Sequence, residues 1–115
     1  MEVAEERLAQ AKKALKLGII PYALIEAYTA MFHAARAVLY RDGIQEKSHY
    51  AIYIYLNEKY PEIPSNLLNI HRIERHETLY GLEYRPTGEE ARAAIVDAEK
   101  FLQQTKKPSS NSKSP

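Results

Sequence analysis

Residues 21–41, PYALIEAYTAMFHAARAVLYR, decide the fold of this chain. Apolar side chains recur here at spacings of three and four residues, which is typical of an α-helix that buries one face. Pro21 suits the first position of a helix, and Asp42-Gly43 ends it. Alanines flank the apolar stripe, so neighbouring helices can approach closely. The predicted core stripe comprises Leu24, Ile25, Tyr28, Met31, Phe32, Ala35, Val38 and Leu39.

The opposite face of the same helix mixes aromatic and titratable side chains. It carries Tyr22, Glu26, Thr29, His33, Arg36 and Tyr40. We expect this face to border a cleft or a partner, with His33 and Arg36 as candidates for binding RNA or a nucleotide. The alternative is a structural role, because polar groups between helices are usually hydrogen-bonded.

Four further helices follow from periodicity and from capping residues. The first covers residues 3–16 and stops at Gly18, and the third begins after Ser48 as its N-cap. The fourth, residues 65–80, has Ser65 as its N-cap and stops at Gly81. Thr87 with Glu90 three residues later is a capping box that opens the last helix. The stripe of this last helix comprises Ala91, Ala94, Ile95, Ala98, Phe101 and Leu102.

Five helices with short connections and no strand pattern predict an all-α fold. The arrangement we expect is an antiparallel, up-and-down bundle of four to five helices, with the second and fourth central and the first and last partly exposed. Residues 1–104 form this bundle. Residues 105–115 are mostly Lys, Pro, Ser and Asn, which bury nothing, so we predict a disordered tail there.

Composition limits the classes of function. At 115 residues the chain holds one domain, and without cysteine it forms neither disulfides nor thiolate metal sites. We expect a cytoplasmic protein with no secretory signal and no membrane association, because no segment is sufficiently apolar. Sixteen basic and fifteen acidic residues give a net charge of +1, so nucleic-acid binding must come from a local cluster.

The strongest cluster is HRIERHETLY, residues 71–80. On a helix Arg72, His76 and Tyr80 share one face and Arg75 lies beside it, while Ile73 and Leu79 are expected to hold the helix to the core. Guanidinium groups bind phosphate, and imidazole titrates near neutral pH. The cluster therefore predicts a phosphate-binding site. The alternatives are a solvated face with ordinary ion pairs, a surface histidine and a tyrosine that only packs.

The spacing of the histidines and glycines does not match that of a metal site or of a glycine-rich phosphate loop. His71 and His76 are five residues apart and do not share a helix face, so we expect no metal site. The four glycines stand singly, which excludes a glycine-rich phosphate loop. We expect no cofactor. His49, near a helix start, is expected to be structural.

Taken together, the second helix and the cluster resemble the HEPN family of small all-helical, nucleotide-binding domains. The resemblance implies a homodimer in which two copies of one motif meet across a cleft. Many members are metal-independent endoribonucleases, and others are toxins whose antitoxin is a minimal nucleotidyltransferase encoded beside them. The segments that carry the resemblance are residues 27–39, 47–49, 75–84 and 97–101.

The family's catalytic motif is an arginine, a polar neighbour, and a histidine after four to six intervening residues. Arg75 matches the arginine and His76 the polar neighbour, but Tyr80 stands where the histidine is expected. The catalytic candidates are therefore Arg75, His76 and Tyr80, with His76 as the base, and Arg72 is a candidate for binding RNA. The resemblance also implies addition of AMP to a tyrosine after the motif, Tyr80 or Tyr84, although the family position falls nearer Leu82.

Two functions remain open at this point. The first is the toxin of a toxin–antitoxin pair, acting on RNA as a homodimer with a weakened endoribonuclease site, since a tyrosine is a poor base at neutral pH. The second is a non-catalytic dimeric module that binds a nucleotide or a partner protein.

Overall fold

The computed structural model describes residues 1–45, 48–81 and 84–111, with only the backbone described for 107–111. Within these ranges the chain forms five helices and no strand, which confirms the all-α prediction. The helices are α1 (Glu2–Lys16), α2 (Ile20–Arg41), α3 (His49–Lys59), α4 (Ser65–Tyr80) and α5 (Gly88–Asn111). Three predictions concern residues outside the described part: the resemblance at Lys47, the family position near Leu82 and the tail over residues 112–115.

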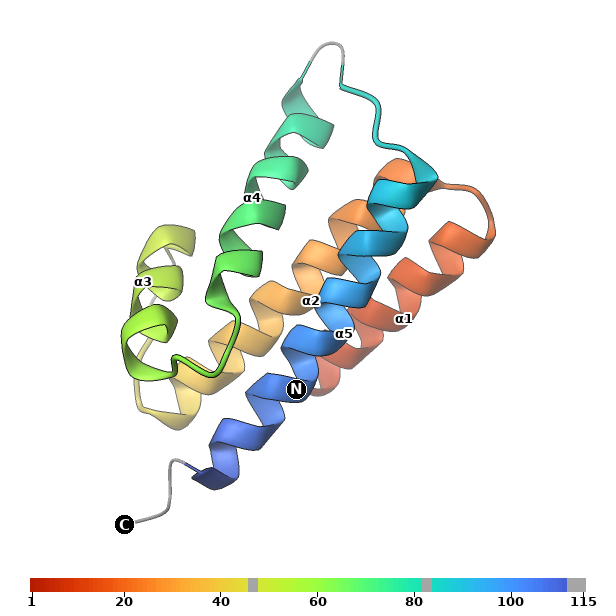
Figure 1. Cartoon of the computed structure of the whole chain (residues 1–115). Helices are drawn as coiled ribbons and strands as arrows, with labels where there is room; N and C mark the ends of the chain where they lie inside the picture. Colours follow the sequence, from red (N-terminus) through yellow and green to blue (C-terminus); the bar gives the residue numbers. More distant parts are fainter. Residues whose placement is uncertain (46–47, 82–83, 112–115) are drawn as a thin grey trace.

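Helix α2 is the centre of the bundle, as residues 21–41 predict. It contacts each of the other four helices, and α1 and α5 lie along it (Figure 1). Its buried side chains include Leu24, Tyr28, Met31 and Leu39, which are at most 1% exposed. The short helix α3 packs beside α4 at the edge of the bundle (Figure 1).

Local sequence signals explain most of the helix ends. Gly18 and Gly43 have positive φ angles of 78° and 76°, a conformation that glycine adopts without strain, and they follow α1 and α2. The Ser48 hydroxyl accepts a hydrogen bond from the Ala51 amide at 3.3 Å, which confirms the predicted cap of α3. Ser65 is not a cap: it is the first residue of α4, and its hydroxyl donates to Asn57 at 3.3 Å.

The prediction for how the fourth and fifth helices pack is partly wrong. Ile73 and Leu79 do not anchor α4, because they are 49% and 43% exposed. Helix α4 is instead buried through Leu68 and His71, and both α1 and α5 pack against α2 more extensively than α4 does. All six residues of the predicted α5 stripe are buried: Ala91, Ala94, Ile95, Ala98, Phe101 and Leu102.

Helix α5 continues past residue 105, where the sequence predicts the tail to begin. Thr105 is fully buried, and its hydroxyl donates to the Leu102 carbonyl at 2.7 Å. Lys106 forms an ion pair with Glu5 of α1 at 2.5 Å. These contacts tie residues 105 and 106 to the bundle, and the helix ends at Asn111.

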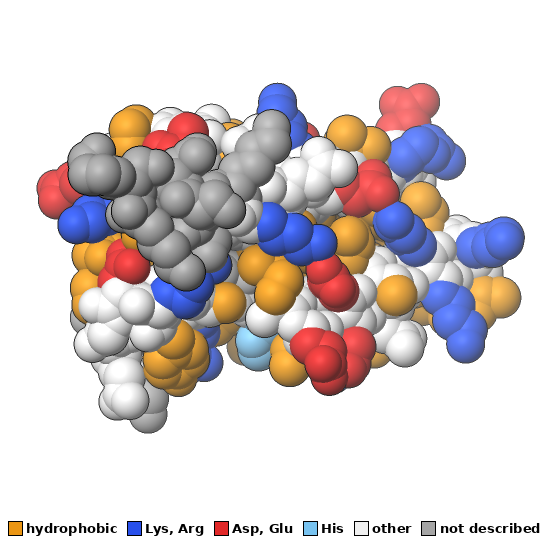
Figure 2. Space-filling model, turned by 90° about the horizontal axis from the view of Figure 1, so that it is seen from below, with side chains coloured by type: hydrophobic (Ala, Val, Ile, Leu, Met, Phe, Trp, Pro, Cys, Tyr) orange, Lys and Arg blue, Asp and Glu red, His pale blue; other side chains and the backbone are white. Residues whose placement is uncertain are grey.

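The charges do not gather on the face drawn in Figure 2. There, basic and acidic side chains are interspersed with hydrophobic ones, in keeping with a net charge of +1. Across the described ranges, no helix has the length and apolar character needed to cross a bilayer.

Candidate functional site

A shallow pocket of about 330 Å³ lies between α4 and the start of α3. Arg72, Arg75 and His76 line it from α4, as their spacing predicts. Three residues at the beginning of α3 line the other side: Ser48, His49 and Tyr50. The chain thus brings its main basic cluster to one hollow.

The two arginines of this pocket have no carboxylate partner among the residues that the structure describes. Arg72 and Arg75 are half-buried, and in the described part of the chain neither forms an ion pair. The guanidinium of Arg72 instead donates to the Asn69 side-chain oxygen at 3.0 and 3.2 Å, which fixes its orientation. Two neighbouring guanidinium groups without a counter-charge favour an anion, and their planar forks fit phosphate oxygens.

Aromatic rings from α2 contact two of the residues that line the pocket, Arg75 and His49. The Arg75 guanidinium lies 5.9 Å from the centroid of the Tyr28 ring. The Tyr28 hydroxyl is hydrogen-bonded to Nδ1 of His49, and the His49 ring stacks on Phe32 at 4.3 Å. Arg75, Tyr28, His49 and Phe32 are therefore connected from α4 through α2 to α3.

Burial shifts the pKa values of Tyr28 and His49 further towards the uncharged forms. It raises the pKa of Tyr28 to about 12, although Arg75 and Arg72 oppose this shift. Burial also lowers the pKa of His49, and here the two arginines act in the same direction. At neutral pH the phenol is therefore protonated and the His49 imidazole is uncharged, so arginines supply the fixed positive charge.

Tyr80 lies beside the pocket without lining it. Its ring centroid is 5.0 Å from that of His76, one helical turn earlier, and the residue is 67% exposed. His76 is also exposed and does line the pocket. The predicted catalytic group thus stays on one side of α4, with Arg75 and His76 in the pocket and Tyr80 at its outer edge.

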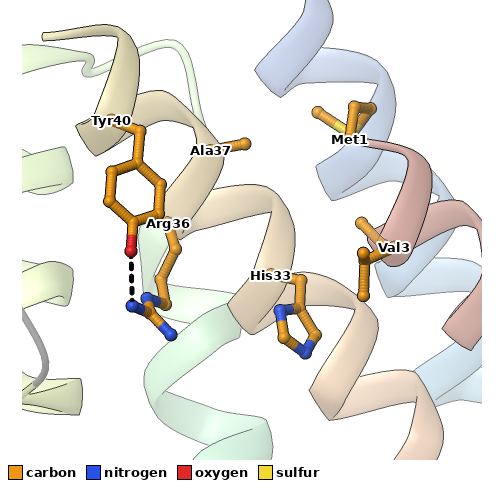
Figure 3. A pocket seen from close by; sticks show the side chains of 7 residues that line it. Met1, Val3, His33, Arg36, Ala37 and Tyr40 are labelled. Atoms are coloured by element: carbon orange, nitrogen blue, oxygen red, sulfur yellow. Dashed lines mark hydrogen bonds between the residues drawn. The ribbon is translucent and has the colours of Figure 1, made fainter.

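The structure does not bring His33 and Arg36 into this pocket. They line a second one, of about 190 Å³, between α2 and the first residues of α1 (Figure 3). Arg36 donates to the Tyr40 hydroxyl at 2.8 Å, and burial, together with Arg36, lowers the pKa of His33. Phe32 connects the two regions, because the Arg36 guanidinium lies 5.7 Å from its ring centroid while His49 also stacks on it.

The Tyr84 hydroxyl lies among carboxylates. Its hydroxyl donates to Glu90 at 3.2 Å. Burial raises the pKa of Tyr84 to about 12, and the charge of Glu90 acts in the same direction. Of the two tyrosines considered for modification, Tyr80 is therefore the more accessible.

His71 and His49 lie in different surroundings. His71, inside the basic cluster, is only 4% exposed and contacts Glu74 and Asp97. His49, expected to be structural, reaches the pocket. No local pattern reveals this, because the contact with Tyr28 spans 21 positions of the sequence. Among the described residues, no three His, Asp or Glu side chains are grouped in a way that could hold a metal ion.

Comparison with known proteins gives consistent similarities. Residues 1–107 match the model of the HEPN domain. The chain is 32% identical to "Putative toxin MJ0605" of Methanocaldococcus jannaschii, with 93% of this chain and 84% of the relative covered. It is 30% identical to a "UPF0332 protein" of Archaeoglobus fulgidus, with 90% and 86% covered.

Proposed function

The chain belongs to the HEPN family, and we propose that it is a toxin-like member that acts on RNA as a homodimer. The phosphate-binding site in this proposal is the pocket between α3 and α4. The observation that carries it is the pair of half-buried arginines, Arg72 and Arg75, which line this pocket without a carboxylate partner among the described residues.

The pocket contains groups suited to metal-independent cleavage of RNA. In that reaction the 2′-oxygen attacks the neighbouring phosphorus, the 5′-oxygen leaves, and a proton is taken from the first and given to the second. Arg72 and Arg75 would hold the phosphate and stabilise the charge that develops on it. His76, which lines the pocket and is exposed, would exchange the proton. Tyr80 beside it would donate a hydrogen bond to phosphate.

The outer face of α4 supports dimerisation. Ile70 and Ile73 are 47% and 49% exposed there, and Tyr80 follows on the same side of the helix. Exposed apolar side chains in one stripe favour an interface. A second copy that covers this stripe would bring its own His76 close to the first, because His76 lies next to the stripe on α4.

A minimal nucleotidyltransferase is the proposed partner. In this proposal the Tyr80 hydroxyl attacks the α-phosphorus of ATP and pyrophosphate leaves, so that AMP is attached beside His76. The exposure of Tyr80 supports it as acceptor over Tyr84, whose hydroxyl is engaged by Glu90. AMP at this position would block the pocket. The intact mass after incubation with partner and ATP is expected to rise in the parent and in Tyr84→Phe, but not in Tyr80→Phe.

The second candidate function is a non-catalytic module that binds a nucleotide or a partner protein through the same pocket. The observation that favours it is the position of Tyr80. This tyrosine replaces the motif histidine and lies at the outer edge of the pocket rather than in its lining. A site of this kind would bind phosphate and leave the RNA intact.

Incubation with RNA in the presence of a chelator separates these functions. The parent is expected to cleave RNA, and Arg75→Ala is expected to lose this activity. Arg92→Ala, which removes an exposed arginine from α5, serves as the control and should cleave like the parent. RNA binding without cleavage would select the non-catalytic module, and the absence of both would contradict the proposed use of the pocket.

A further inference from the structure

His49 lines the pocket but takes no part in the family motif or in the proposed reaction. It enters from α3, whereas the arginines and His76 come from α4. One of its ring nitrogens, Nδ1, is hydrogen-bonded to Tyr28, and Nε2 has no hydrogen-bond partner among the described residues. Because Nδ1 is turned to the buried phenol, Nε2 is the nitrogen that a ligand in the pocket can reach.

The contact with Tyr28 decides which nitrogen carries the proton. The Tyr28 hydroxyl has His49 as its only hydrogen-bond partner in the described part of the chain, and the residue is 1% exposed. If Nδ1 donated to the phenol oxygen, the phenol proton would be buried without an acceptor, which is costly. Since a phenol is protonated at neutral pH and burial raises the pKa of this one further, the hydroxyl donates and Nδ1 accepts. The proton of the imidazole is then on Nε2.

Packing holds the ring in this orientation. The His49 ring stacks on Phe32 with the centroids 4.3 Å apart, and the Tyr28 ring, nearly parallel to it, lies 5.8 Å away. The same Tyr28 ring lies under the Arg75 guanidinium. One buried tyrosine therefore positions both a guanidinium and an imidazole, which come from different helices.

We propose that His49 is a phosphate-binding residue of this site, whose Nε2–H donates to an oxygen of a phosphate held by Arg72 and Arg75, and that Tyr28 is the positioning residue that selects this tautomer. The inference rests on the proposed function of the pocket. It adds an oriented donor from α3 that requires no positive charge on the imidazole. The ligand class is a phosphodiester or phosphomonoester.

The tautomer is tested directly on the unmodified protein. In ¹⁵N-labelled protein, long-range ¹H–¹⁵N spectra distinguish a protonated from an unprotonated ring nitrogen. Nε2 of His49 is expected to carry the proton, and Tyr28→Phe, which keeps the ring and removes only the hydroxyl, is expected to give a mixture of tautomers. His71 provides an internal control, because its contacts with Glu74 and Asp97 do not involve Tyr28. A proton found on Nδ1 of His49 in the parent would overturn the proposal.

The binding role is tested with a short single-stranded RNA as the probe. His49→Ala is expected to weaken its binding roughly tenfold, because a hydrogen bond to a charged oxygen is lost. His49→Gln, which can place an amide donor near the former Nε2, should recover part of the affinity. Tyr60→Phe is the matched control for Tyr28→Phe, because it removes a hydroxyl from another buried tyrosine, one that donates to Asp42 and does not line the pocket.

The outcomes separate this inference from the proposal on which it rests. Binding by the parent that His49→Ala leaves unchanged would remove the role of His49 alone. No binding by the parent would remove the proposed function, and this inference with it. A variant is compared only if its thermal unfolding shows a folded protein, and Tyr28→Phe supplies the comparison if His49→Ala does not fold.

Discussion

Nε2 of His71 on α4 lies 2.8 Å from the Asp97 carboxylate on α5. Nδ1 of the same ring contacts Glu74 one turn further along α4. This buried imidazole joins the helix that carries the pocket to the helix that packs along the core. Helix α4 buries few apolar side chains, so the polar contact contributes much to its position.

His71→Ala is therefore expected to destabilise the protein by about 2–3 kcal/mol, because it leaves a cavity and removes two hydrogen bonds. Urea unfolding of His71→Ala, Asp97→Ala and the double variant measures the coupling between the two residues. A coupling on the order of 1 kcal/mol is expected for residues in direct contact. Additive effects of the two substitutions would show that the contact does not stabilise the fold.

Thr87→Ala is expected to cost about 1 kcal/mol of stability, the usual effect of losing an N-cap. The Thr87 hydroxyl accepts from the Glu90 amide at 3.1 Å, and the Glu90 carboxylate accepts from the Thr87 amide at 2.8 Å. Both bonds satisfy amides at the start of α5. Thr87→Ser retains the hydroxyl and should unfold at nearly the parent's urea concentration. If both variants lost the same stability, the cap would not be the cause.

Stability is expected to fall as the pH decreases below about 6.5, the ordinary pKa of histidine. The pKa values of His49 and His33 are lowered in the folded protein, mainly by burial. The unfolded chain therefore binds protons first as the pH falls, and stability rises with pH across this window. Urea unfolding between about pH 5 and about pH 7.5 should show a shallower pH dependence in His49→Gln than in the parent. An equally steep dependence in both would contradict the lowered pKa of His49.

Two carboxylates with lowered pKa values titrate below this pH range. The pKa values of Asp42 and Glu90 are also lowered in the fold, from ordinary values of 3.8 and 4.5. Burial acts to raise the pKa of Asp42, but hydrogen bonds from Tyr55 and Tyr60 lower it. The pKa of Glu90 is lowered mainly by the hydrogen bond from the Thr87 amide. Their contribution is lost only as the pH falls through the folded pKa, below those ordinary values.

Much of the fold can be predicted from the sequence, because the patterns that mark each helix and its ends are local. The apolar stripe of residues 21–41 predicts α2, and Thr87 with Glu90 predicts the start of α5. Which side chains of α4 are buried cannot be predicted in this way. Its exposed Ile73 looks like a core residue, whereas its buried His71 depends on Asp97, which lies 26 positions away.

Only the part of the candidate site that α4 forms can be predicted from the sequence. Helical spacing places Arg72, Arg75 and His76 together, and the structure has them in one pocket. The same reasoning does not locate His49, whose place depends on Tyr28 in a different helix. It also does not show that His33 lies away from the cluster, on a turn of α2 that faces the start of α1.

Ile73→Glu is expected to convert the proposed homodimer into a monomer. A charge at the centre of the exposed stripe on α4 would have to be buried in the interface, which is costly. Light scattering coupled to gel filtration should give twice the chain mass of 13.2 kDa for the parent and 13.2 kDa for the variant.

Leu17→Glu is the matched control for this substitution. Leu17 is 66% exposed and follows α1, a helix that, within the described ranges, does not contact α4. The control variant should remain a dimer. A monomeric parent, or equal dissociation of both variants, would contradict an interface formed by this face of α4.

The salt dependence of RNA binding tests most directly whether Arg72 and Arg75 hold phosphate. For single strands, the slope of the logarithm of the binding constant against that of the salt concentration changes by about 0.7 for each phosphate neutralised. Arg72→Gln and Arg75→Gln are each expected to weaken binding and to reduce this slope by about that amount, while Arg92→Gln on α5 leaves it unchanged. Slopes for Arg72→Gln and Arg75→Gln that equal the parent's would show that RNA is bound elsewhere, or not at all, and would contradict the account.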